Sequence, residues 1–179
     1  MSRGEPRVVS REEARAGSLA VRRVLAVAVL VLVLDQLTKR LVVQAIDRGT
    51  REEVLPFLDL TYVRNDGVAF SSFSDQPWIV GLLVVGALTA LTFWFLRNRT
   101  VRLAWLAAGM LAGGAIGNVL DRVVEGAVID FLKPPNWPAF NLADVAIVGG
   151  MILLVVVVEL ENRRKTNTKG RRETRPQRG

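Results

Sequence analysis

Histidine and cysteine are both absent from the 179 residues of the chain. Their absence excludes a serine or cysteine nucleophile activated by histidine, a histidine proton relay, and a zinc site built on His or Cys ligands. Any acid–base chemistry therefore falls mainly to carboxylates. Asp130 and Asp144 are the first candidates, because both lie on the same predicted side of a membrane protein.

Long apolar runs are abundant. Half of the residues are hydrophobic, and four blocks approach the roughly 20 residues that make one helical membrane span. The blocks are residues 24–46, 78–96, 103–120 and 142–160. The first is interrupted after Leu34 by charged residues, so a cleaved signal peptide is an alternative interpretation. Because no small-residue cleavage site follows Leu34, we interpret this block as a retained helix.

Basic residues are distributed unevenly around these blocks. Seventeen of the 24 lysines and arginines lie in segments 1–23, 97–102 and 163–178. Short cytoplasmic segments carry such an excess, so both termini are expected in the cytoplasm and connections 47–77 and 121–141 on the outer side. This placement accounts for the net charge of +7 without a nucleic-acid partner.

The expected fold is an α-helical membrane protein with four transmembrane helices, a small outer β-cradle and a short amphipathic outer segment. Residues 24–160 form the membrane domain. Residues 1–23 and 161–179 are Arg-rich and poor in aromatics, which favours disordered cytoplasmic tails near anionic lipid headgroups.

The first outer connection contains a strand signal. Leu58, Leu60 and Tyr62 alternate with more polar positions, a period of two that predicts a strand. Asn65 begins an Asn-Asp-Gly turn, after which residues 68–73 can return as a second strand. The expected outer β-cradle depends on pairing between these two strands. The alternative to a cradle is an ordinary hairpin at the membrane interface.

Small and polar residues share the third span. Its glycines permit close approach of another helix. They are Gly109, Gly113 and Gly117, spaced every four residues, with Gly114 beside them. At the outer end, Asn118 is followed by Asp121 and Arg122 on the same face. The alternative to a functional cluster is an interfacial ion pair between Asp121 and Arg122 that ends the span.

Asp130 is flanked by Val128, Ile129, Phe131 and Leu132. An apolar setting disfavours the ionised carboxylate and raises its pKa, which suits a proton-donating acid. The alternative is an acid that faces water from an amphipathic segment on the membrane surface.

Asp144 occupies the third position of the fourth predicted helix, where Asn141 can act as N-cap. A helix N-terminus favours an ionised acid, so capping alone is an alternative role. The proline-rich turn at 134–138 gives the chain a means to bring Asp130 and Asp144 together. In that case Asp144 would act as base and Asp130 as acid, one ionised and one protonated.

Asp35 and Lys39 lie one turn apart in the first span and can form an internal ion pair. Such groups also occur in a small transporter or channel, which is the main alternative from another functional class. A non-catalytic membrane subunit is a third possibility, and it would tolerate Asp→Asn changes at positions 130 and 144.

Five motifs in order resemble those of the bacterial lipoprotein signal peptidase family, also called signal peptidase II. They are D-Q-L-T-K at 35–39, N-D-G-V-A-F-S at 65–71, G-N-V-L-D-R at 117–122, V-I-D-F at 128–131 and F-N-L-A-D at 140–144. Val68 and Ile129 stand where the family often has alanine and valine. Both substitutions are apolar and leave the expected fold and chemistry unchanged.

The resemblance implies a membrane-embedded aspartic peptidase that cuts diacylglyceryl-modified prolipoproteins just before the lipidated cysteine. Asp130 and Asp144 would be the catalytic pair, with no metal or other cofactor. The resemblance also assigns supporting residues and a structural ion pair. The supporting residues are Asn65, Gly67, Asn118, Asp121, Arg122 and Asn141, and the ion pair is Asp35 with Lys39. A monomer in the bacterial cytoplasmic membrane, surrounded by lipids and with its site toward the outer face, is expected.

Overall fold

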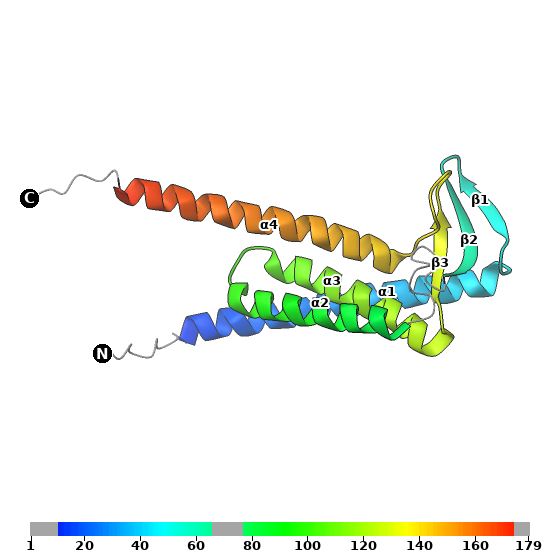
Figure 1. The fold of residues 1–179 in the computed structure, drawn as a ribbon, viewed down its shortest axis with the longest axis horizontal. Coiled ribbons are helices and arrows are strands. Elements are labelled where there is room, and N and C mark those ends of the chain that lie inside the picture. Colours follow the sequence, from blue (N-terminus) through cyan, green and yellow to red (C-terminus); the bar gives the residue numbers. More distant parts are fainter. Residues whose placement is uncertain (1–10, 66–76, 174–179) are drawn as a thin grey trace, which may run out of the picture.

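The computed structural model describes residues 11–65 and 77–173. Four helices and three strands occur in it: α1 (Arg11–Ala45), β1 (Arg51–Leu55), β2 (Leu58–Asn65), α2 (Pro77–Asn98), α3 (Ala104–Glu125), β3 (Val128–Lys133) and α4 (Leu142–Glu173). The helices run lengthwise and the small sheet lies across one end of them (Figure 1). The first turn of α1 and the last turn of α4 lie at the opposite end (Figure 1).

Two helical stretches within the described residues are long and apolar enough to cross a bilayer, 15–45 in α1 and 142–167 in α4. Only 11% and 22% of their most apolar windows are buried in the protein, whereas the core helix of a soluble protein would be mostly covered. In α3, four glycines together with Asn118 and Asp121 lower the hydropathy. Within the described residues neither α2 nor α3 is among these stretches, so the count of four spans stays a prediction.

The glycines of α3 hold the bundle together. A Cβ at Gly113 would lie 2.6 Å from the Ala28 carbonyl oxygen of α1, and one at Gly114 would lie 2.5 Å from the Ala143 carbonyl oxygen of α4. Such distances are shorter than real side chains allow, so only glycine permits these backbones to approach so closely. The predicted close helix contact is confirmed, and α3 uses it on two sides.

The sheet is antiparallel in the order β1-β2-β3. The predicted strand at 58–63 is confirmed as part of β2. Its partners are β1 and β3, because β2 pairs Leu60 with Leu132 and Val63 with Asp130. The second strand expected at 68–73 lies outside the described residues.

The segment around Asp130 differs from the amphipathic surface segment that was the alternative for this acid. Residues 128–131 are all buried in β3, which pairs with β2 and contacts α3 and α1. An amphipathic strand would alternate between buried and exposed positions, and this one does not. The amphipathic alternative for the segment around Asp130 is therefore wrong, and the short amphipathic outer segment of the expected fold stays a prediction.

Helices also extend into the predicted tails. α1 begins at Arg11 and α4 continues to Glu173, so residues 11–23 and 161–173 are helical. Extending an existing helix costs far less than starting one, and ion pairs one turn apart, such as Arg163 with Glu159, support the extension of α4. The expectation of disorder does not hold for these residues.

Candidate active site

Asn141 and Asp144 cap the start of α4 reciprocally. The Asp144 backbone N–H donates to Asn141 Oδ1 at 2.9 Å, and the Asn141 backbone N–H donates to Asp144 Oδ2 at 3.2 Å. This arrangement is a capping box, and it confirms the predicted N-cap. It also occupies only one oxygen of Asp144, so capping leaves the second oxygen for another contact.

Asp130 lies beside this cap, in the middle of β3. Its side chain is 2% exposed, and each carboxylate oxygen accepts from an amide. Asn141 Nδ2 donates to Oδ1 at 2.8 Å and Asn65 Nδ2 donates to Oδ2 at 2.9 Å. The water-facing alternative for Asp130 is therefore wrong.

Burial raises the pKa of Asp130 from its ordinary 3.8 to about 6. The Asn65 amide opposes this rise by donating to the carboxylate, while the negative charge of Asp144 adds to it. The Asn141 amide and the Lys39 ammonium also lower the pKa of Asp130. At a moderately acidic pH, Asp130 is therefore partly protonated and able to give a proton, which agrees with the role of acid suggested by its neighbours in the sequence.

Two asparagines connect Asp130 to Asp144, and we call them the amide bridge (Asn118 and Asn141). Asn141 Nδ2 donates to Asn118 Oδ1 at 3.1 Å as well as to Asp130, and Asn118 Nδ2 donates to Asp144 Oδ1 at 2.8 Å. The structure thus brings together side chains from β3, α3 and the start of α4. This cluster contains both acids that the sequence singled out.

A buried cation lies behind the amide bridge. Lys39 is 1% exposed, and its ammonium lies 2.7 Å from a carboxylate oxygen of Asp35 and 2.7 Å from one of Asp121. Its third contact is Asn118 Oδ1, at 3.2 Å. The ion pair expected between Asp35 and Lys39 is present, and it belongs to a larger network than the sequence indicated.

Asp35 has a second contact that sequence reasoning did not identify. Its Oδ1 accepts the backbone N–H of Ala143 at 2.9 Å, so an acid of α1 caps the second residue of α4. A helix N-terminus has four unpaired N–H groups and favours negative charge. Asp35 therefore fixes the start of the helix that carries Asp144.

Asp121 connects the helices to β3. Its Oδ2 accepts the Ile129 backbone N–H at 3.2 Å, and its Oδ1 accepts from Gln36 Nε2 at 2.7 Å. Sequence analysis gave Gln36 no role, although a polar residue inside an apolar helix was a usable signal. These contacts hold the strand one residue before Asp130.

The alternative of an interfacial Asp121–Arg122 ion pair is wrong for the described residues. Asp121 pairs with Lys39, whereas the exposed Arg122 donates to the Asn118 carbonyl oxygen at 3.1 Å within its own helix. Asn65 lies within the cluster, and Gly67 lies outside the described residues. In residues 11–65 and 77–173, no three His, Cys, Asp or Glu side chains gather as a metal site requires.

The arrangement can carry out acid–base chemistry with two carboxyl groups in unlike settings. Asp130 is buried and favours its protonated form, while Asp144 is half-buried at a helix N-terminus, where negative charge is favoured. One acid able to donate a proton and one able to accept it, joined through a common amide bridge, is the requirement for hydrolysis by a carboxylate pair.

The family model described as signal peptidase (SPase) II matches residues 27–159. The chain belongs to the signal peptidase II family. It is therefore a protease, and the transporter or channel alternative is not supported. The matched residues include both aspartates, the amide bridge, and Lys39 with its two acidic partners.

Similar proteins include curated lipoprotein signal peptidases of Polynucleobacter necessarius, Shewanella baltica strain OS155 and Syntrophomonas wolfei. Their identities to this chain are 38%, 40% and 39%. The alignments cover 77%, 79% and 76% of this chain and 90%, 88% and 92% of the relatives. The likeness thus covers most of each signal peptidase II protein.

Solved structures agree with this assignment. Two structures described as bacterial membrane enzymes are 31% and 30% identical, with TM-scores of 0.71 and 0.72. They cover 75% and 79% of this chain, which covers 91% and 90% of theirs. Together with the apolar faces of α1 and α4, this places the signal peptidase II chain among bacterial membrane proteins.

Proposed function

We propose that this chain is an aspartic endopeptidase that removes the signal peptide from diacylglyceryl-modified prolipoproteins, cutting just before the lipidated cysteine. Asp130 and Asp144 are its catalytic pair. Family membership and the names of the curated relatives support the proposal that prolipoproteins are the substrate. The observation that carries the choice of residues is the amide bridge, because it ties these two acids to each other.

The reaction begins from the form in which Asp144 is ionised and Asp130 carries the proton. Asp144 takes a proton from water as the water oxygen bonds to the scissile carbonyl carbon, and Asp130 gives its proton to the carbonyl oxygen. The C–N bond then breaks as the proton on Asp144 passes to the leaving nitrogen. Asp130 recovers a proton from a hydroxyl of the intermediate, so both acids return to their starting state.

Other side chains of the cluster act on these two acids. The amide bridge holds one oxygen of each, and Asn65 steadies the ionised form of Asp130 through its second oxygen. Lys39 orients Asn118: with Lys39 and Asn141 both donating to its Oδ1, the Asn118 NH₂ must point to Asp144. Lys39 and Asp35 are thus positioning residues, and Asp121 and Arg122 support them.

The proposed topology has four transmembrane helices in the bacterial cytoplasmic membrane, both termini in the cytoplasm and the catalytic pair toward the outer face. The basic connection that contains Arg99 lies at the helix ends remote from the sheet (Figure 1), as an inward placement of positive charge requires. The enzyme works as a monomer surrounded by membrane lipids, and residues 24–160 are the catalytic domain.

The test is cleavage of a diacylated prolipoprotein by the purified chain in detergent, followed as a mobility shift, with the product's N-terminal residue identified by mass spectrometry. The expected product begins with the lipidated cysteine. The same precursor without its diacylglyceryl group is the matched control and should remain intact. Cleavage of neither precursor, or cleavage at another bond, would overturn the proposed function.

A further inference from the structure

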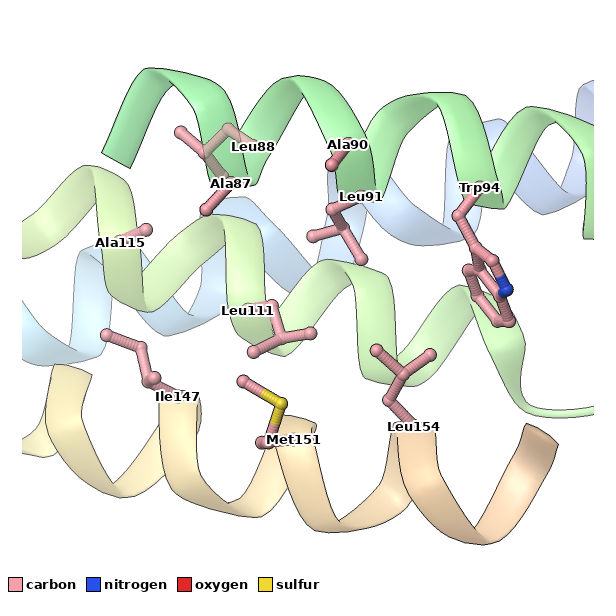
Figure 2. A pocket seen from close by; sticks show the side chains of 10 residues that line it. All are labelled: Ala87, Leu88, Ala90, Leu91, Trp94, Leu111, Ala115, Ile147, Met151 and Leu154. Carbon is pink, nitrogen blue, oxygen red and sulfur yellow. The ribbon is translucent and has the colours of Figure 1, made fainter. Parts of the chain in front are cut away.

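Helix α3 borders two hollows of different character. One lies between α2, α3 and α4, and its walls are apolar side chains such as Leu91 and Leu111 (Figure 2). The other has a volume of about 280 Å³ and lies between α1, α3 and the sheet. We call it the polar crevice, because hydrogen-bonding and charged side chains line it. They include Gln36, Arg40, Gln44, Tyr62, Asp121 and Glu125.

The polar crevice lies on the other face of β3 from the carboxylate of Asp130. Successive side chains of a strand point to opposite faces. Ile129 lines the crevice, whereas both oxygens of Asp130 accept from the asparagines of the proposed catalytic cluster. Lys39 and Asp121 are buried at the floor of the crevice. A ligand bound there is therefore separated from the proposed catalytic pair by β3.

One charge of each sign in the polar crevice is available to a ligand. The ammonium of Lys39 lies 2.7 Å from each of two buried carboxylates, so these charges are already paired. Arg40, in contrast, is exposed and has no hydrogen bond or ion pair within residues 11–65 and 77–173. The Glu125 carboxylate pairs with Arg64 only at 3.8 Å, near the limit for an ion pair. The crevice thus offers a guanidinium and a carboxylate.

Two neutral donors accompany Arg40. Gln44 follows it by four positions, which is one turn of α1, and Tyr62 lines the same crevice from β2. In the part of the chain that the structure describes, neither the Gln44 amide nor the Tyr62 hydroxyl has a hydrogen-bond partner. A guanidinium with further N–H and O–H donors suits a phosphate, and the carboxylate of Glu125 suits an ammonium.

Apolar side chains lead away from the polar crevice. Exposed Val43 and Val124 line it beside the polar groups. On α1, Val33 and Val29 precede Gln36 by three and seven positions, which places them on the same side of the helix, and both are exposed. The crevice is therefore polar where α1 and α3 end at the sheet (Figure 1) and continues into an apolar helix face. A lipid with a polar headgroup has this same division.

We propose that the polar crevice binds the headgroup of a zwitterionic phospholipid of the phosphatidylethanolamine type. Arg40, Gln44 and Tyr62 bind its phosphate, Glu125 binds its primary ammonium, and its acyl chains follow the apolar face of α1. Phosphatidylglycerol has the phosphate but no ammonium for Glu125. This site is separate from the proposed peptidase reaction, and only its placement in the outer leaflet rests on the proposed topology.

The test measures lipid binding to the purified chain in detergent by native mass spectrometry, with melting temperature recorded alongside. The probes are phosphatidylethanolamine, phosphatidylglycerol and diacylglycerol with identical acyl chains. Phosphatidylethanolamine should bind most tightly, and diacylglycerol, which lacks phosphate, least. Arg40→Gln should raise the Kd of both phospholipids by about tenfold or more, the effect of losing a hydrogen bond to a charged group. Glu125→Gln should remove the preference for phosphatidylethanolamine over phosphatidylglycerol.

Arg48→Gln is the matched control, because Arg48 is an exposed arginine just beyond α1 that does not line the crevice. It should bind each lipid as wild type does, and melting curves without lipid show that every variant folds. An equal loss in Arg48→Gln would mean that any arginine near the headgroups suffices, and it would overturn the site. Unchanged binding by Arg40→Gln would also overturn it.

The other contrary results concern the ligand. A wild type that binds phosphatidylglycerol or diacylglycerol as tightly as phosphatidylethanolamine would contradict a zwitterionic headgroup. Inorganic phosphate added alone should leave the melting temperature unchanged, and stabilisation equal to that by the lipid would assign the crevice to a free anion instead. Each of these results leaves the cleavage of prolipoproteins untouched, so the proposed function is tested separately.

Discussion

At the scale of single residues, the orientation of one amide decides whether Asp144 has a hydrogen-bond partner. Asn118 Oδ1 accepts from Lys39 and from Asn141, which leaves its NH₂ for Asp144. An amide rotated by 180° would place an oxygen against a carboxylate and an NH₂ against an ammonium. The buried charge of Lys39 therefore influences the proposed catalytic pair through a neutral side chain.

Asn118→Asp tests this orientation with almost no change of shape. The new carboxylate can still accept from Lys39 and Asn141, but it repels Asp144 in place of donating to it. We expect kcat to fall by about 10²-fold, the order found when a positioned polar contact is removed from a reacting group. Cleavage assays with thermal melting measure this effect. Asn98→Asp, at the remote end of α2, should keep full activity, and equal losses in both variants would contradict the orienting role.

The pH dependence follows from the raised pKa of Asp130, about 6. The proposed mechanism needs this acid protonated, so kcat/KM should decline as pH rises through the pKa of the free enzyme. Asn65 donates to the ionised form and lowers this pKa. Asn65→Ala should therefore raise it and move the alkaline limb of the profile to higher pH.

The measurement for Asn65 is the pH profile of kcat/KM for wild type and Asn65→Ala over pH 4 to 9. Because the two acids titrate as a pair, the profile reports their joint proton. A limb that moves to lower pH in the variant would contradict the contact between Asn65 and Asp130. A lower rate with no movement of the limb would mean that Asn65 acts in another way.

At the scale of elements, α3 is the helix against which α1 and α4 pack, through glycines that touch each of them. Gly113→Ala would force its new Cβ to within 2.6 Å of a carbonyl oxygen of α1. Overpacking of this kind costs about 1–3 kcal/mol. The displacement would also disturb Asn118, five residues further along the helix, so activity should fall together with stability.

Gly86→Ala is the matched control, because a Cβ at Gly86 meets nothing within 4 Å. Alanine is the better helix former, so this change should leave stability equal or slightly higher. Thermal denaturation in detergent, with activity measured alongside, compares the two variants. Equal stability of both would show that close helix approach at Gly113 does not hold the bundle together.

Secondary-structure elements could be predicted where the local sequence pattern was sufficient. The strand at 58–63 appeared as an alternation, and the N-cap at Asn141 as a residue type before an apolar run. The strand that carries Asp130 was not identified, because its residues are buried on both faces and show no alternation. Its pairing with β2 depends on residues far away in the chain.

At the scale of the whole molecule, the site depends on contacts between elements that sequence spacing does not reveal. Asp130 and Asp144 were identifiable as acids in unlike settings, and Asp35 with Lys39 as a pair one turn apart. The contacts of Lys39 with Asp121 and Asn118 connect α1 to α3 and arise only when the helices pack. Sequence reasoning could thus name the acids but could not describe the network that holds them.

The proposed topology can be tested because the chain contains no cysteine. A cysteine introduced at exposed Glu53 in β1 should react with a membrane-impermeant maleimide in intact cells, because the proposed topology places the sheet on the outer side. A cysteine at Thr100, between α2 and α3, should react only after the membrane is permeabilised. Labelling of both positions, or of Thr100 alone, in intact cells would contradict the four-span arrangement.

The most direct test of the catalytic pair is the cleavage rate of Asp130→Asn, Asp144→Asn and the double variant, each shown to be folded by its melting curve. If the two acids act as one unit, each single change should lower kcat by about 10³-fold or more, and the double variant should be little worse than either. A folded single variant that keeps full activity, or losses that simply multiply in the double variant, would contradict the joint action of Asp130 and Asp144.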